Sequence, residues 1–474
     1  PPAPLTYPRA AVSHQRLSAA DASFLHLETS TSPMHVGSVM LFEGRPFLDD
    51  SGRFRLDDVR LLVESRLPLV PRARQRVMQV PLASGLPVWV DDQRFDLSYH
   101  IRLTALPRPG SEAQLLALAG RLLAAPLDRR RPLWELWFVE GVQGDRVALV
   151  HKTHHAMVEG VSSGDVASVL FDDQPSAPPA ATEITPWEPA PPPSAAALLA
   201  GTVVDRARQT TEALGNLRAV TEPGAALGAA REVSRALRAV GSQEAPLVPF
   251  NGPISAGRRV EVARVDLEAV KTVKRAFGCT VNDVVLAMVT GGLRTYLEGD
   301  AHVDVDHLVL KALVPVSVQE DSGERVAAFI VDLPVGLAGS VDQLQAIAAS
   351  LRRLKAEGAL SVGSIAHLLR FAPPTLLSLA ARLVPRQRAV NLVVTNVPGP
   401  PVPRWCMGAR LLEPFPFLGL AGQLGLTVAV VSYDSQLHVG LTADPELVPD
   451  LGVLAEALEK AASDLIAAGE DVDG

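Results

Sequence analysis

The sequence predicts an α/β (α+β) protein built from two halves that a long connection joins. Its 474 residues exceed what one ordinary hydrophobic core uses, so two domains plus connections are expected. Patterns typical of strands and of helices alternate on both sides of residues 174–193, a stretch crowded with Pro and Ala that cannot form a regular helix. We therefore expect an N-terminal lobe over residues 1–173, a linker with crossover helices over 174–255, and a C-terminal lobe over 256–474.

The elements expected in the N-terminal lobe follow from capping residues and from the spacing of apolar residues. Ser18 as N-cap, with Asp21 three residues later, starts a short helix that runs to residue 27. Residues 134–140 alternate as a half-buried strand does, and they pair through a turn with a second strand over 146–154. The other elements expected here are strands over residues 34–43, 88–90 and 99–103 and helices over 56–67 and 112–124.

After the linker, helices and strands are expected to alternate again. Thr280 as N-cap, with Asp283 at the third helical position, forms a capping-box pattern and starts a long helix over residues 281–297. Residues 194–243 are rich in Ala and Leu and suggest helices interrupted near Pro223. The remaining expected elements are strands over residues 258–264, 308–318, 328–335, 392–395, 424–433 and 437–442 and helices over 267–277, 341–357, 361–369 and 449–467.

Composition excludes several classes of function. A formal net charge of −8 argues against a general nucleic-acid binder, whose footprint is basic. Cys279 and Cys406 are too few for a disulfide framework, so we expect reduced packing residues in a cytoplasmic protein. Nothing near the start is typical of a signal peptide, and no run of about 20 uncharged apolar residues predicts a membrane span. Peripheral contact with a membrane or lipid-droplet surface stays open.

One short stretch carries the strongest chemical signal. A predicted strand ends in His154 and His155, and Glu159 and Gly160 follow within a turn. Adjacent side chains on an extended segment point to opposite sides, so one imidazole can face a cavity while the other braces the turn. A neutral imidazole can take a proton from a hydroxyl group near neutral pH. Gly160 allows a tight turn, and the Glu159 carboxylate can hold its shape.

These residues resemble the HHxxxDG motif of the acyltransferases that share the chloramphenicol acetyltransferase fold, a superfamily that includes peptide-synthetase condensation domains. Within it, the chain is similar to the bacterial wax ester synthase/diacylglycerol acyltransferase family. Glu159 stands where that family usually has Asp, an acid that is mainly structural, so the departure concerns the brace of the turn more than the base. Five further segments resemble the family and come in its order: SAADASFL (18–25), PMHVG (33–37), PLW (132–134), VNDVV (281–285) and TNVPGP (395–400).

The resemblance implies two chloramphenicol acetyltransferase-like lobes that form a pseudo-dimer with the active-site channel between them. It implies an acyl-CoA-dependent O-acyltransferase that transfers a long-chain acyl group to diacylglycerol and gives triacylglycerol. Long-chain fatty alcohols, which would give wax esters, are the alternative acceptor. His155 would be the general base, His154 would orient the loop, and Glu159 with Gly160 would hold the turn. Acyl-CoA enters as a substrate, and no metal or bound organic cofactor is implied.

Two other chemistries use the same region. His151, His154 and His155 could ligate a metal with Glu159 as the fourth ligand, although neighbouring histidines are hard to aim at one ion. Residues 160–164 also match G-x-S-x-G, the nucleophile elbow of serine hydrolases, which would make Ser162 the nucleophile.

A later acid and histidine, for example Asp332 and His438, are in the chain order that such a hydrolase needs. Two milder interpretations also stay open. The histidines are ordinary residues at the end of a strand, or the fold is kept while Glu159 weakens the chemistry and leaves a lipid-binding protein.

Four further segments are candidates for supporting or lining the site. Asn282 and Asp283 begin a helix, and the resemblance implies that this pair supports the site structurally. Pro132, Leu133 and Trp134 begin the strand that pairs with the histidine strand, so they either line a substrate channel or pack in the core.

Thr395 and Asn396 lie where a predicted strand passes into a turn. Their hydroxyl and amide groups could bind an oxyanion or the pantetheine arm, or the two residues could simply form the turn. Residues 365–384 are unusually apolar, and either line an acyl tunnel, dip into a lipid surface, or form a buried helical hairpin.

Overall fold

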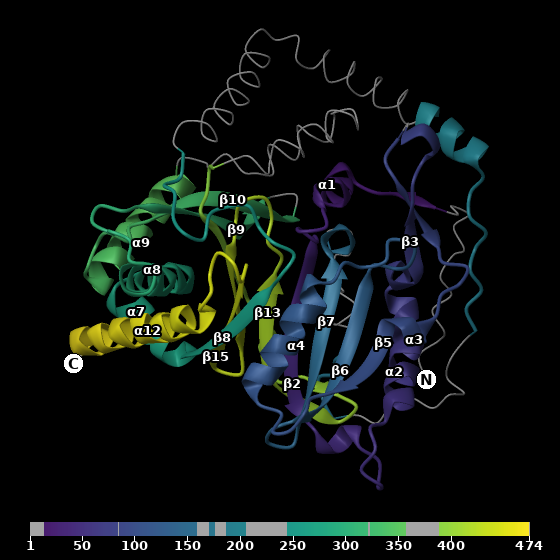
Figure 1. Cartoon of the computed structure of the whole chain (residues 1–474), viewed down its shortest axis with the longest axis horizontal. Coiled ribbons are helices and arrows are strands. Elements are labelled where there is room, and N and C mark those ends of the chain that lie inside the picture. Colours follow the sequence, from purple (N-terminus) through teal and green to yellow (C-terminus); the bar gives the residue numbers. More distant parts are fainter. Residues whose placement is uncertain are drawn as a thin grey trace.

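Figure 1 shows the computed structural model of the chain, in which two lobes lie side by side. The structure describes residues 14–83, 85–158, 170–175, 186–204, 244–320, 323–356 and 388–473. In these parts of the chain each lobe is built on one six-stranded sheet, and a three-stranded sheet is added to the N-terminal lobe. The two-lobed α/β architecture expected from the sequence is therefore present.

The N-terminal lobe has the strand order β12-β13-β2-β7-β6-β5. These strands are β12 (Trp405–Cys406), β13 (Ala409–Leu418), β2 (His35–Glu43), β7 (Arg146–His154), β6 (Trp134–Val142) and β5 (Ile101–Ala105). The small sheet has the order β1 (Gln15–Arg16), β4 (Val88–Asp91) and β3 (Gln75–Met78). The helices of this lobe are α1 (Ala19–Leu27), α2 (Leu56–Arg66), α3 (Leu97–His100) and α4 (Glu112–Ala124), with 3₁₀ turns η1 (Arg45–Phe47), η2 (Leu67–Leu69), η3 (Pro71–Arg74), η4 (Pro81–Ala83) and η5 (His155–Met157).

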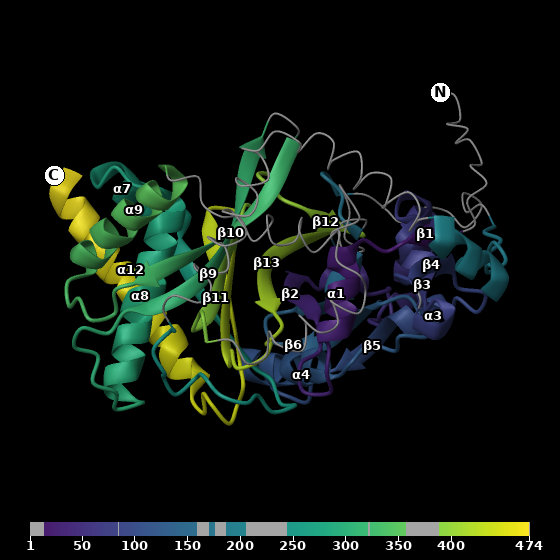
Figure 2. The same cartoon turned by 90° about the horizontal axis from the view of Figure 1, so that it is seen from above.

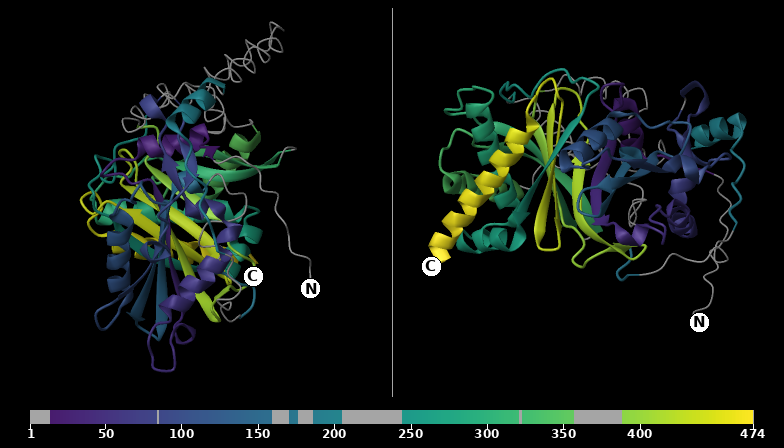
Figure 3. Two further views of the ribbon diagram at one scale, coloured as in Figure 1. Left: turned by 90° about the vertical axis from the view of Figure 1, so that its right-hand side faces the viewer. Right: turned by 60° about the horizontal axis from the view of Figure 1, so that its bottom comes forward.

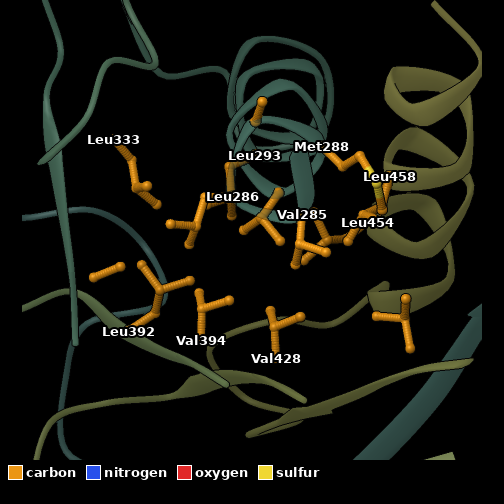
Figure 4. Close-up of a cluster of buried hydrophobic side chains, with 14 of the residues drawn as sticks. Val285, Leu286, Met288, Leu293, Leu333, Leu392, Val394, Val428, Leu454 and Leu458 are labelled. Carbon is orange, nitrogen blue, oxygen red and sulfur yellow. The ribbon is translucent and has the colours of Figure 1, made fainter. Parts of the chain in front are cut away.

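The C-terminal lobe has the strand order β10-β9-β11-β14-β15-β8, with helices packed on one face of the sheet (Figure 3). The strands are β10 (Gly323–Leu333), β9 (Leu310–Glu320), β11 (Leu392–Val397), β14 (Leu426–Tyr433), β15 (Gln436–Ala443) and β8 (Arg259–Asp266). The helices are α7 (Leu267–Ala276), α8 (Val281–Gly299), α9 (Ser340–Ala356) and α12 (Leu451–Asp473). Figure 4 shows the core of this lobe, where side chains of α8 and α12 meet those of β11 and β14.

One strand crosses between the lobes. β13 follows β11 in the sequence, yet it pairs antiparallel with β2 and so completes the sheet of the N-terminal lobe, with Leu418 opposite Val36. Figure 2 shows β13 between the two lobes. At the crossing, a Cβ added to Gly440 of β15 would overlap the carbonyl oxygen of Pro416, so only glycine allows this close approach of the two backbones. Residues assigned by sequence to the C-terminal lobe therefore build part of the N-terminal one.

Local capping explains where several helices begin. Thr280 accepts the N–H of Asp283 at 3.2 Å, and the Asp283 carboxylate accepts the N–H of Thr280 at 2.7 Å, so the predicted capping box is confirmed. Ser18 likewise accepts the N–H of Asp21 at 3.0 Å at the start of α1. The predicted strand over residues 99–103 begins late, because Asp96 caps a single helical turn, α3, before β5 starts at Ile101.

Two further expectations bear on the surface and the cysteines. Cys279 and Cys406 are both free and pack against the cores of their lobes. Within the described ranges, no single helix is long and apolar enough to cross a membrane, and α7 with α8 reaches that length and hydropathy only as a pair bent by 103°. Helices were expected over residues 194–243, and the described part of this range contains the helix Ala195–Val204. Residues 205–243, the helix expected over 361–369 and the apolar segment 365–384 lie outside the described residues.

Candidate active site

The two histidines stand where β7 ends against two other strands. The His154 N–H donates to the carbonyl of Leu133 at 3.0 Å, and the His155 N–H donates to the carbonyl of Met34 at 2.9 Å. His154 is the last residue of β7, and His155 opens the 3₁₀ turn η5. Backbone hydrogen bonds to the residues just before β6 and β2 thus position both histidines without any contribution from their side chains.

His154 is completely buried and is held by a hydrogen bond at one ring nitrogen. Its Nδ1 accepts the backbone N–H of Ala156 at 3.0 Å, which occupies the lone pair of that nitrogen. A ring nitrogen that accepts carries no proton, so Nε2, which faces a carboxylate oxygen of Glu28 at 3.7 Å, is the nitrogen that carries one. An imidazole fixed in this way shapes the turn and is not exposed to a substrate.

Glu28 follows α1 and gathers three basic groups around one buried carboxylate. Its oxygens lie 3.4 Å from Nε2 of His35 and 3.7 Å from Nε2 of His154, and one accepts Nε–H of Arg129 at 2.8 Å. Burial raises the pKa of the Glu28 carboxyl, but the two imidazoles and the Arg129 guanidinium outweigh burial and hold the pKa below its usual range. Glu28 is therefore a fixed negative charge behind the histidine pair.

His155 is half-buried and has a different environment. Its ring stacks on Phe24 of α1, with centroids 4.7 Å apart and planes within 16° of each other. Burial, and secondly the neighbouring His154 and His35, lower the pKa of His155 to about 4. The imidazole is therefore neutral at pH 7 and can accept a proton, and of the two neighbouring histidines it is the one that a substrate can reach (Figure 1 shows α1 beside the end of β7).

A buried lysine fastens the histidine strand to the helix beside it. Lys152 of β7 is 2% exposed, and its Nζ donates to the carbonyls of Leu122 and Ala125 at the end of α4, both at 3.0 Å. The carboxylate of Glu135 lies 3.2 Å from the same nitrogen. The ammonium group thus satisfies carbonyls that the end of α4 leaves without helical partners, and it fixes β7 against that helix.

Comparison with known proteins identifies the family to which the chain belongs. Residues 17–285 match the family described as the wax ester synthase/diacylglycerol acyltransferase catalytic domain, and residues 322–465 match its C-terminal domain. The chain belongs to this family. It is 32% identical to a putative diacylglycerol O-acyltransferase of Mycobacterium tuberculosis, over 96% of this chain and 91% of that one. A probable diacylglycerol O-acyltransferase of the same organism is 34% identical over 95% and 96% of the two chains.

Solved structures show the same fold. The wax ester synthase/diacylglycerol acyltransferase from Marinobacter aquaeolei VT8 is 26% identical with a TM-score of 0.68, over 96% of this chain and all of that one. The trichothecene 15-O-acetyltransferase from Fusarium sporotrichioides is 11% identical with a TM-score of 0.59, and the starter condensation domain of rhizomide synthetase is 13% identical with a TM-score of 0.52; each match covers 95% of both chains. The last two show the fold alone. The resemblance inferred from the sequence motifs is confirmed, and the chain is an acyltransferase.

In this acyltransferase the segment Pro132–Trp134 touches the site through its backbone. The carbonyl of Leu133 accepts the His154 N–H, while the Leu133 side chain is completely buried. Trp134 is also completely buried, donates its Nε1–H to the Ala73 carbonyl at 2.8 Å, and stacks on His100 with centroids 4.4 Å apart. These contacts give both side chains a packing role. Contact of this segment with a substrate stays a prediction.

The other predicted site residues belong to the C-terminal lobe. Asp283 is buried and closes the cap of α8 with Thr280, while Asn282 is half-buried beside it. Thr395 and Asn396 are half-buried near the end of β11, opposite Ala429 and Val430 of β14. Support of the site by the first pair, and binding of an oxyanion or pantetheine by the second, stay predictions.

Three predicted residues lie outside the described part of the chain: Glu159, Gly160 and Ser162. The proposed metal site includes Glu159 as its fourth ligand, so the structure describes only the three histidines of that site. Among the described residues no three His, Cys, Asp or Glu side chains gather as metal ligands would. His151 lies on the other face of β7 from His154, and its Nε2 bonds the hydroxyl of Thr153 at 2.7 Å.

Glu28, His35 and Arg129 had no role in the sequence-based site. The segment PMHVG, which contains His35, marks one of them by its resemblance to the family. Glu28 directly follows the predicted helix over residues 18–27, which is a second sequence signal for the site. Periodicity alone, however, does not connect Glu28 to a histidine far along the chain.

Proposed function

We propose that this chain is an acyl-CoA-dependent diacylglycerol O-acyltransferase in which His155 is the general base. The observation that carries the proposal is the contrast between the two histidines: His154 is buried and engaged at Nδ1, whereas the neutral ring of His155 is half-buried and backed by Phe24. The relatives described above support diacylglycerol as the acceptor, because their names specify it.

The reaction balances without an acyl-enzyme intermediate. The imidazole of His155 takes the proton of the acceptor hydroxyl while its oxygen attacks the thioester carbonyl carbon, so a C–O bond forms and the C–S bond breaks. The resulting imidazolium returns the proton to the thiolate of coenzyme A. Because burial lowers the pKa of His155, its protonated form is a stronger acid than an ordinary imidazolium and gives up that proton more readily. His154 and Glu28 hold the turn from behind.

Long-chain fatty alcohols are the second candidate acceptor. The solved relative from Marinobacter carries both activities in its name, and a fatty alcohol presents the same primary hydroxyl on an apolar chain. We propose that diacylglycerol is preferred, since the names of the curated relatives above specify it. The proposed chemistry uses no bound metal or organic cofactor, so dialysis of the enzyme against EDTA should leave its rate unchanged.

The deciding experiment measures product from radiolabelled palmitoyl-CoA with dioleoylglycerol or hexadecanol. Wild type should form labelled triacylglycerol, and His155→Ala should lose about 10²–10⁴-fold in rate. His302→Asn, which changes an exposed histidine in a loop of the C-terminal lobe, is the matched control and should keep full activity. Preferential formation of wax ester would move the assignment to the alternative acceptor.

Two variants separate the remaining interpretations. Loss of product in Ser162→Ala but not in His155→Ala would transfer the chemistry to a serine hydrolase. Acyl-CoA binding without product would indicate a lipid-binding protein, and a gain of product in Glu159→Asp would then trace the loss to the extra methylene of Glu159.

A peripheral contact with lipid is the finer part of this proposal. Dioleoylglycerol is insoluble in water, so the enzyme must meet it at a membrane or lipid-droplet surface. We expect the full-length protein to float with phosphatidylcholine vesicles that contain dioleoylglycerol. A protein that stays in the dense fractions, with active transferase present, would exclude stable attachment.

A further inference from the structure

One part of the linker between the lobes is fastened to the N-terminal lobe. Residues 186–193, which we call the strap, run beside the small sheet (Figure 1 shows the linker from residue 186 to 204 in teal). The Ala190 N–H donates to the Asp91 carboxylate at 3.0 Å, and the Ala190 carbonyl accepts the side-chain amide of Gln93 at 2.7 Å. Beyond the strap, Leu198 is 2% exposed and packs on β4. A segment that only connects two lobes needs none of these contacts.

Trp187 of the strap touches two residues of the lobe. Its ring lies 4.9 Å from the guanidinium carbon of Arg74, and its centroid is 6.0 Å from that of Phe95, edge to face at 80°. Arg74 is 6% exposed, and its Nε has no hydrogen-bond partner among the described residues. The face of the indole therefore provides the buried guanidinium with a favourable contact.

A column of stacked rings leads from Phe95 into the core of the N-terminal lobe. Phe95 stacks on His100 with centroids 5.3 Å apart, and His100 stacks on Trp134 with centroids 4.4 Å apart. The Nδ1–H of His100 also donates to the Trp134 carbonyl at 2.8 Å. His100 and Trp134 are completely buried. Because close-packed rings cannot tilt independently, a shift of Phe95 is passed on to Trp134.

A second route from Trp187 to Trp134 runs along the backbone of η3. Ala73 directly precedes Arg74, and the carbonyl of Ala73 accepts the indole N–H of Trp134 at 2.8 Å. Trp187 therefore closes a circle of contacts that holds the Trp134 side chain both at its stacked face and at its N–H group.

The Trp134 backbone lies beside the turn that carries the proposed base. Trp134 is paired with Thr153 of β7, and the carbonyl of Leu133 accepts the His154 N–H. A displaced start of β6 would hence move the residue that precedes His155. Displacement of a reacting group by about 1 Å can cost on the order of 10²-fold in rate.

We propose that Trp187 is a positioning residue for acyl transfer, because the strap holds the start of β6 through these contacts and, with it, His154 and His155. The assignment rests on the proposed role of His155 as the base. Trp187 contacts neither histidine, so its effect falls on the orientation of the base and therefore on kcat. The linker thus contributes to the site in addition to joining the lobes.

The test compares variants of Trp187 in the full-length protein. Trp187→Leu removes both ring contacts and should lower kcat for triacylglycerol formation about three- to tenfold, with both KM values unchanged. Trp187→Phe keeps an aromatic ring and should retain at least about half of the wild-type rate. Trp405→Leu is the matched control: Trp405 is also half-buried, but it lies in β12 at the opposite edge of the sheet and should keep the wild-type kcat. Urea denaturation of each variant shows whether it is folded in the assay.

The imidazole resonances of protein labelled with ¹⁵N-histidine give a readout that needs no turnover, so they separate this proposal from the proposed function. Trp187→Leu should shift the His100 and His154 signals, assigned with His100→Gln and His154→Gln, even if no acceptor is acylated. Trp405→Leu should leave both signals in place.

Three results would overturn the proposal. They are an unchanged His154 signal in folded Trp187→Leu, a wild-type kcat in that variant, and a raised KM at unchanged kcat, which would assign the strap to substrate binding. If Trp187→Leu does not fold, Gln93→Ala, which removes only the hydrogen bond to the Ala190 carbonyl, decides by the same His154 signal.

Discussion

The ring of Phe24 lies face to face with the imidazole of His155, 4.7 Å away and nearly parallel to it. Phe24 comes from α1, whose next turn leads to Glu28, the carboxylate behind His154. One helix near the start of the chain therefore sets both histidines, one by stacking and the other by charge. The first two predictions separate these contributions.

Phe24→Leu should lower kcat for triacylglycerol formation about tenfold with little change in either KM. Leucine keeps most of the apolar contact but removes the flat surface, so the His155 ring gains orientations that do not suit proton transfer. Phe54→Leu is the control, because Phe54 stacks on Phe47 with centroids 5.6 Å apart, away from the histidines. Equal kcat in both variants would show that the stack only packs.

Glu28→Gln should lower kcat by about tenfold or more, because it removes the negative charge that faces His154 while keeping the shape of the side chain. The low pKa of Glu28 means that the carboxylate is ionised throughout the assay range. Its stabilising effect is therefore present above the unfolded pKa near 4.5 and is lost as the pH falls further. Glu298→Gln, at an exposed partner of Arg294, should match wild type. Full activity in Glu28→Gln would exclude the positioning role.

The pH dependence of kcat/KM should report the low pKa of His155. The base is active when neutral, so the rate should stay level from pH 8 to about 5.5 and fall as the imidazole is protonated near its pKa of about 4. A decline centred near pH 6.5 would mean that the base lies in water or is another group.

The stability of the fold should change over the same acid range. Burial lowers the pKa of His155 and of His100 to about 4, so the folded state binds fewer protons than the unfolded state, and stability is lost as the pH falls from 6.5 toward 4. Near-ultraviolet circular dichroism at each pH separates unfolding from titration of the base.

Trp134→Phe should destabilise the protein by about 1–3 kcal/mol, since it removes the bond to the Ala73 carbonyl and leaves that buried carbonyl without its donor. Both KM values should stay unchanged if Trp134 only packs against His100. Urea denaturation and steady-state kinetics on the same preparation provide the comparison. A KM that rises at unchanged stability would instead support the sequence-based prediction that this segment lines the substrate channel.

The sequence predicted those parts of the structure that local patterns determine. The hairpin of β6 and β7, the delivery of His154 and His155 at its end, and the capping box of Thr280 with Asp283 all follow from residues close together in the chain. The family motifs added the two-lobed arrangement. The predictions of these features were correct because each depends only on residues close together in the sequence, or on a resemblance that spans the chain.

What the sequence did not predict depends on contacts between distant segments. Nothing local distinguishes Glu28 from any other acid after a helix until β2 and β7 bring His35 and His154 to it. Lys152 is a charged residue within the otherwise largely apolar β7, and only the position of α4 reveals that its ammonium group is buried. The pairing of β13 with β2 joins residues from opposite halves of the chain, which periodicity cannot specify.

The pairing of β13 with β2 also has a consequence for synthesis. While the ribosome is still making the C-terminal half, the N-terminal sheet lacks its outer strands, and the edge of β2 exposes unpaired N–H and C=O groups. The sheet of the N-terminal lobe therefore becomes complete only after residue 418 has emerged. A nascent chain stalled before that point would offer an open sheet edge to other chains, so this enzyme should depend on chaperones more than a protein of two separately folding domains.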